Sequence, residues 1–81
     1  MKARVYVSLK NTVLDPQGQA IHAALAGLGH AAITDVRQGK FFDLAIADGV
    51  SKEQARAEIE TIAQDVLTNP VIETYGVELV D

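Results

Sequence analysis

The two halves of this chain repeat one apolar pattern, and this repeat limits the possible folds more than any other feature. Each half has four apolar residues at the spacing of one helical face. The two sets, 38 positions apart, are Ile21, Ala24, Leu25 and Leu28, then Ile59, Ile62, Ala63 and Val66. The flanking segments alternate like strands at nearly the same offset. The pattern predicts two similar βαβ units joined at Gly39 and Lys40.

The first half is predicted to contain a strand, a helix and a second strand. The first strand covers residues 4–9, where every second residue is apolar. The alternating residues are Val5, Val7 and Leu9. The helix covers residues 16–28 and ends before Gly29, which can take a positive φ. The second strand is expected over residues 32–38.

The second half repeats this order. A strand over residues 40–47 has Phe42, Leu44 and Ile46 on one side. A capping box at residues 51–54, in which the Ser51 hydroxyl accepts from the Gln54 amide, begins the second helix. The Thr-Asn-Pro sequence at residues 68–70 ends this helix, and a last strand covers residues 71–80. The predicted inner face of the helix is Ala55, Ile59, Ile62, Ala63 and Val66.

This order, βαββαβ, predicts an α+β fold with antiparallel strand pairing in one domain over residues 1–81. Two βαβ units can interleave into one four-stranded, ferredoxin-like sheet. Alternatively, residues 32–47 stay extended and pair with another chain. A chain of 81 residues buries only about 60% of its unfolded surface. This chain has no cysteine for a disulfide and only two histidines, too few for a closed zinc site, to stabilise a small core. We therefore favour a fold that is completed by dimerisation.

Charge and hydropathy exclude two classes of partner. The net charge is -4 and Lys and Arg form no run, so the phosphate backbone of a nucleic acid would be repelled. The apolar stretches are far shorter than the roughly 20 residues that cross a bilayer. The first residues, MKARVYV, lack the apolar core of a signal peptide. We expect a cytoplasmic protein with no nucleic-acid or membrane partner.

The sequence VLDPQG at residues 13–18 begins the first helix. Asp15 suits the N-cap and Pro16 suits the first helical position. Gly18 is unexplained by this, because glycine costs about 1 kcal/mol in a helix relative to alanine. A close approach of another backbone or of a ligand would account for it. The stretch is therefore a helix start alone, or a helix start that also forms a contact site.

Residues 38–42, QGKFF, raise a second question. Gly39 and Lys40 resemble part of a phosphate loop, but the upstream glycine and the following Ser or Thr are absent. A kink between two strands is the simpler interpretation. Phe41 and Phe42 must face opposite sides of a strand. One therefore fills the core, and a partner surface is the natural cover for the other.

No group of residues predicts chemistry by this chain alone. Neither His22 nor His30 has a nucleophile or carboxylate at the spacing of a triad. The second helix carries acidic residues among Lys52 and Arg56, which is typical of a solvated face. We predict no catalytic residue, no metal site and no active site in the isolated chain.

Three stretches in order resemble the PurS family, the small subunit of phosphoribosylformylglycinamidine synthase. They are VLDPQG at residues 13–18, DVRQGK at residues 35–40 and NPVIE at residues 69–73, and the likeness covers nearly the whole chain. The resemblance implies a noncatalytic dimer that bridges a large synthetase subunit and a glutaminase subunit. The complex of this family uses ATP, Mg and glutamine to convert formylglycinamide ribonucleotide to formylglycinamidine ribonucleotide; this chain alone would bind no cofactor.

The matching positions supply the candidate subunit-contact residues. They are Asp15, Gln17, Gly18, Arg37, Gly39, Lys40, Asn69 and Pro70. The main alternative function is a dimeric ligand-sensing module of the ACT type, which has the same βαββαβ order and binds an amino acid. A third class is a stand-alone enzyme on a ferredoxin-like scaffold, but no cluster of residues in the sequence predicts an active site of this kind.

Overall fold

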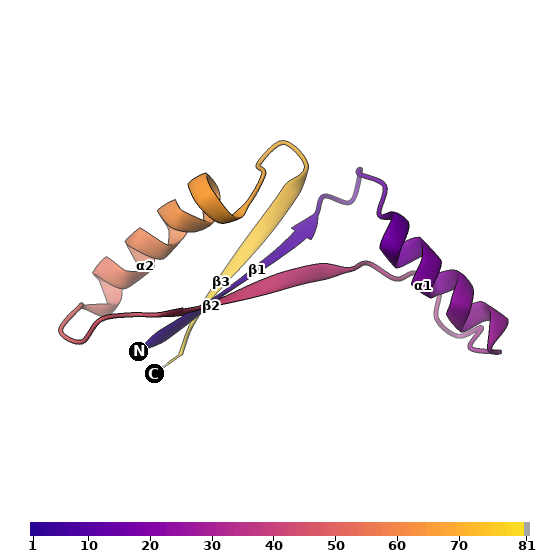
Figure 1. The fold of residues 1–81 in the computed structure, drawn as a ribbon, viewed down its shortest axis with the longest axis horizontal. Coiled ribbons are helices and arrows are strands. Elements are labelled where there is room, and N and C mark those ends of the chain that lie inside the picture. The colour runs from indigo at the N-terminus through magenta and orange to yellow at the C-terminus, as the bar shows by residue number, and fades with distance from the viewer. Residues whose placement is uncertain (81) are drawn as a thin grey trace.

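The structure, a computed structural model, describes residues 1–80 and consists of a sheet, a helix packed on it and a helix that projects from it (Figure 1). The elements are β1 (Lys2–Leu9), α1 (Pro16–Gly27), β2 (Gly39–Ala45), α2 (Lys52–Ile62), the π-helical turn η1 (Ala63–Leu67) and β3 (Glu73–Val80). The predicted α+β class with antiparallel pairing is confirmed.

The sheet has the strand order β2-β1-β3, and both neighbours run antiparallel to β1. The register places Val5 between Phe42 on one side and Val77 on the other. Because β1 is central and alternates, its inward residues are fully covered: Val5 is 0% and Val7 2% exposed. The predicted alternation of this strand is therefore confirmed.

Helix α2 and the turn η1 cover one face of the sheet. The buried core cluster is Ala3, Val5, Val7, Ile59 and Ala63. The helix begins as predicted, with the Ser51 Oγ atom accepting from the Gln54 N–H at 3.1 Å. The three predicted inward residues of the 40–47 segment, Phe42, Leu44 and Ile46, pack against this core. The opposite face of the sheet has no helix over it among residues 1–80 (Figure 1).

One residue of the predicted inner face of α2 points the wrong way. Val66 is 73% exposed, whereas the next residue, Leu67, packs against the core. The prediction assumed a period of 3.6 residues, but the last turn is π-helical and has more residues per turn. The π turn therefore rotates Val66 outward and brings Leu67 inward.

Helix α1 forms an arm that projects from the sheet instead of packing on it (Figure 1). Gly18 is its one buried residue, and Ile21 and Leu28 on its apolar face are exposed. Gly29, which follows the arm helix, has φ +93°, as expected of a residue that ends a helix in this way. The molecule measures 51 × 27 × 14 Å, so it is long and flat.

The expected strand over residues 32–38 finds no strand partner within residues 1–80. These residues run back along α1 and join β2 at Gly39 (Figure 1). The paired register ends where Ser8 meets Gly39, because β1 stops at Leu9 and the chain then turns into the arm. In the described part of the chain no strand therefore lies opposite residues 33–38, and these residues make no ladder hydrogen bonds there.

Candidate functional site

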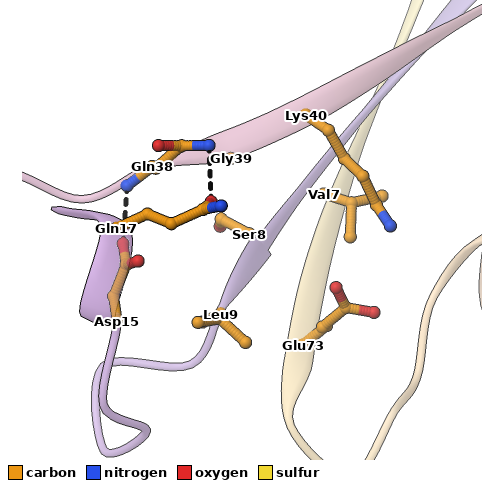
Figure 2. Close-up of a pocket in the computed structure, with 9 residues that line it drawn as sticks. All are labelled: Val7, Ser8, Leu9, Asp15, Gln17, Gln38, Gly39, Lys40 and Glu73. Carbon is orange, nitrogen blue, oxygen red and sulfur yellow. Dashed lines mark hydrogen bonds between the residues drawn. The ribbon is translucent and has the colours of Figure 1, made fainter.

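The arm is joined to the sheet by one buried carboxylate. The Oδ1 atom of Asp15 accepts from the Gly18 N–H at 3.0 Å, which caps α1. The Oδ2 atom accepts from the Gln38 N–H at 2.7 Å, immediately before β2 begins (Figure 2). Asp15 is 4% exposed. One side chain thus connects the start of the arm helix to the segment that returns from it.

Gly18 is required by the closeness of that returning segment. A Cβ atom at this position would lie 2.4 Å from the Val36 carbonyl oxygen and 2.6 Å from Asp15 Oδ2. Both distances are well inside van der Waals contact, so no side chain fits. The unexplained glycine of the VLDPQG stretch therefore admits another backbone, and that backbone belongs to the same chain.

Two further side chains hold the same junction. The Arg37 Nη2 atom donates to the carbonyl oxygens of Lys10 at 2.9 Å and Val13 at 3.0 Å. The Gln38 side-chain amide donates to the Gln17 side chain at 2.7 Å (Figure 2). The loop between β1 and α1 is therefore tied to the segment before β2. We call this set of contacts, centred on Asp15, Gly18, Arg37 and Gln38, the arm junction.

The arm junction favours the charged form of Asp15. The Gln38 N–H, the largest influence, and the Gly18 N–H both donate to the carboxylate and hold its pKa below the ordinary 3.8. Burial opposes this by raising the pKa, and the positive charge of Arg37 adds to the lowering. The hydrogen bonds prevail, so Asp15 is a charged structural group rather than a proton donor near neutral pH.

A cavity of about 240 Å³ lies beside the junction, where the three strands meet the arm (Figure 2). It is lined by Val7, Ser8, Leu9, Asp15, Gln17, Gln38, Gly39, Lys40 and Glu73. Asp15, Gln17 and Gln38 are already hydrogen-bonded to one another or to the backbone. No nucleophile paired with a base lines the cavity.

The structure brings most of the candidate contact residues together. Asp15, Gln17, Gly18, Arg37, Gly39 and Lys40 all lie at the arm junction or line its cavity. Asn69 and Pro70 lie in the turn before β3, and the Lys10 N–H donates to Ile72 O at 2.8 Å, so this turn is at the same end of the sheet. The role of these eight residues in subunit contact stays a prediction.

Sequence reasoning missed Gln38 and Glu73, which both line the cavity. Gln38 contributes its side-chain amide to Gln17 and its backbone N–H to Asp15, and the backbone contact is one that no residue type reveals. Glu73 accepts a hydrogen bond from the Asn69 N–H at 2.7 Å. The NPVIE sequence, with an amide and a carboxylate on either side of a proline, is the signal that could have indicated Glu73.

The uncovered face of the sheet carries an aromatic pair. Tyr6 and Phe41 are 44% and 55% exposed, with ring centroids 6.3 Å apart. The Arg4 guanidinium lies 4.4 Å from the Phe41 ring centroid and binds Asp43 at 2.7 Å. Because Phe42 packs on the core, the two adjacent phenylalanines face opposite sides as predicted. We call this surface, with Arg4, Tyr6, Phe41 and Asp43, the open face.

Among residues 1–80, no three His, Asp or Glu side chains gather as a metal site would need. No helix in this described part is long and apolar enough to cross a membrane. The fold and the arm junction thus define a class: a small α+β protein with an antiparallel sheet, one covered face and a projecting helical arm.

Comparisons with known proteins identify the family within this class. Residues 2–81 match the family described as PurS, phosphoribosylformylglycinamidine (FGAM) synthase. The chain is 49% identical to phosphoribosylformylglycinamidine synthase subunit PurS of Mycobacterium leprae, over 94% of this chain and 91% of that one. It is 40% identical to the Bacillus subtilis PurS subunit, over 96% and 90%. The chain belongs to the PurS family.

Solved structures agree with this assignment. A Bacillus subtilis PurS structure has a TM-score of 0.83 at 39% identity and covers 99% of this chain and 98% of that one. A chain in the structure of PurLQS from Thermotoga maritima has a TM-score of 0.86 at 28% identity, covering 98% and 95%. The ACT-type alternative is therefore not favoured.

Proposed function

We propose that this chain is a noncatalytic bridge in a phosphoribosylformylglycinamidine synthase complex. It joins the ATP-dependent synthetase subunit to the glutaminase subunit, so that ammonia from glutamine reaches formylglycinamide ribonucleotide. ATP and Mg belong to the complex, and this chain alone holds neither. Membership of the PurS family and the likeness to a chain of PurLQS support this assignment. A cytoplasmic location fits such a role.

The observation that carries the proposal is the extended shape of the single chain. Its radius of gyration is 16.2 Å, whereas a compact domain of 81 residues has about 12 Å. The arm keeps Ile21 and Leu28 exposed, and residues 33–38 have no strand partner among the residues that the structure describes. Such a chain has too little core to be stable alone. Its surfaces are arranged for partners rather than for a substrate.

We further propose that the first partner is a second copy of this chain. The open face offers the exposed aromatics Tyr6 and Phe41, and the arm offers an apolar helix face and an unpaired extended segment. The arm junction holds the arm away from its own sheet. An arm in this position can reach the open face or the sheet edge of another copy, which completes both cores.

Omission of this chain tests the bridging function. The cognate synthetase and glutaminase are mixed with glutamine, Mg-ATP and formylglycinamide ribonucleotide, with and without this protein. We expect glutamine-dependent product only when the chain is present. Each enzyme's partial reaction, measured alone, is the control that both subunits are active. Equal product formation without this chain would remove the bridging role.

A further inference from the structure

The arm contributes no apolar residue to the buried core. Within residues 1–80 the buried apolar residues belong to β1, to α2 and to the turn η1. We call the sheet together with α2 and η1 the sheet unit. Ile21, Leu28 and Ile33, in the arm helix and the segment that follows it, are 41%, 75% and 44% exposed. Apolar burial therefore stabilises the sheet unit and not the arm.

Helix α1 is weak by itself. It has 12 residues, and a helix of this length is only marginally stable in water without packing, because its nucleation is unfavourable. Gly18 and Gly27 lower its stability further, because glycine is a poorer helix former than alanine. Asp15 caps the first turn, but the last turn has no basic residue to interact with the helix dipole. The helix therefore depends on contacts outside itself.

Those outside contacts are concentrated at the base of the arm. The arm junction holds the first turn of α1 beside the start of β2. Beyond the junction, one side-chain hydrogen bond in the described chain joins α1 to the segment that runs back along it. In this bond the His22 Nε2 atom donates to the Ile33 carbonyl oxygen at 3.0 Å. The bond is exposed, so water competes for both groups and its net contribution is small.

From this difference we propose that the arm opens before the sheet unit does. The part of α1 beyond Gly18 and residues 28–34 unfold together, while the arm junction, β1 and α2 stay formed. Segments with few buried apolar contacts have the lowest free energy of local opening. The boundary falls at the junction because Asp15 and Gly18 are the only buried residues between residues 10 and 38.

Opening of this kind couples the arm helix to assembly. A partner that covers the apolar side of the arm binds only the formed helix, so the formed fraction limits the apparent affinity. The arm is then a conformational device, because its helix forms fully only when a partner covers it. This coupling rests on the proposed contact with a second copy, whereas the order of opening does not.

Hydrogen–deuterium exchange of the full chain tests the order of opening. Exchange is recorded in urea below the main unfolding transition, at two protein concentrations at which sedimentation equilibrium gives the mass. At the lower concentration we expect the amides of residues 20–27 to exchange at least about tenfold faster than those of residues 3–8 in β1. At the higher concentration, association should slow exchange in residues 20–27 more than in residues 3–8.

Two variants separate the two units. Gly27→Ala adds a Cβ atom that nothing approaches within 4 Å, so it should slow exchange in α1 by up to about fivefold and leave β1 unchanged. Val5→Ala leaves a cavity in the core, so it should speed exchange in β1 by at least about tenfold and leave residues 20–27 unchanged. If Val5→Ala fails to fold, Ala55→Gly, a milder change at a buried position of α2, takes its place with the same direction of change.

Equal exchange rates in α1 and β1 at the lower concentration would overturn the proposal. A variant that changes exchange in both segments by the same factor would overturn it as well. If the chain has the mass of a single copy at both concentrations and α1 still exchanges faster than β1, the order of opening is supported and the proposed self-association is defeated. The two failures are therefore distinguishable.

Discussion

The Asp15 carboxylate accepts a hydrogen bond from the Gln38 N–H at 2.7 Å, and these residues are 23 positions apart. The same carboxylate caps α1 through Gly18. One buried side chain therefore determines both where the arm helix begins and where its return segment meets the sheet.

Acid should weaken the arm junction. Folding lowers the pKa of Asp15 below 3.8, so the ionised form contributes stability that is present above pH 3.8 and is lost as pH falls through the lowered pKa. We expect the wild-type Tm to fall more steeply in this acid range than that of Asp15→Asn, in which no charge can be lost. Thermal melts from neutral pH downward measure this. Asp48→Asn controls for the change in net charge. If the Tm of the wild type fell with pH no more steeply than the Tm of Asp15→Asn, the prediction would be contradicted.

Gly18 and Gly27 should respond oppositely to alanine. At Gly18 the new Cβ would meet Val36 O at 2.4 Å, so we expect Gly18→Ala to destabilise the fold by about 1–3 kcal/mol. At Gly27 nothing lies within 4 Å of the new atom. Gly27→Ala should be neutral or stabilise α1 by up to about 1 kcal/mol. Urea denaturation of both variants compares them, and equal effects would mean that the Val36 contact is unimportant.

The core should depend on the central strand. Val5 is 0% exposed, and removal of its two methyl groups leaves a cavity under α2. We expect Val5→Ala to lower the free energy of unfolding by about 2 kcal/mol. Val71→Ala removes the same atoms at a site that is 77% exposed, and should change stability by less than about 0.5 kcal/mol. Denaturation curves of both variants, recorded at the same protein concentration, compare their free energies of unfolding.

The elements that local patterns control were predicted well. The alternation of apolar residues predicted the position of β1. The capping residues Asp15 and Ser51 begin the two helices where they were expected. The errors arise from features without a local signal. A π turn displaced Val66 from the predicted face, and the early end of β1 left residues 33–38 without a partner.

The candidate site was predicted less completely than the fold. The three motifs identified residues that meet at one end of the sheet, although they are far apart in sequence. They did not show that Asp15 binds the Gln38 backbone or that Gly18 faces Val36, because each pairing depends on how the arm folds back. Motifs indicate which residues matter, whereas tertiary structure decides what each one contacts.

Self-association should depend on Phe41, which is 55% exposed on the open face. An aromatic ring buries about 150–250 Å² when covered, so its loss removes a large part of any contact there. We expect Phe41→Ser to lower the mass measured by sedimentation equilibrium and to remove the dependence of Tm on protein concentration.

Leu14→Ser changes a side chain that is 62% exposed but lies outside the open face and the arm, and should leave the mass unchanged. Phe42→Ser, on the core side, should instead lower stability at every concentration. A Phe41→Ser protein that keeps the wild-type mass would show that the open face is not where two copies meet.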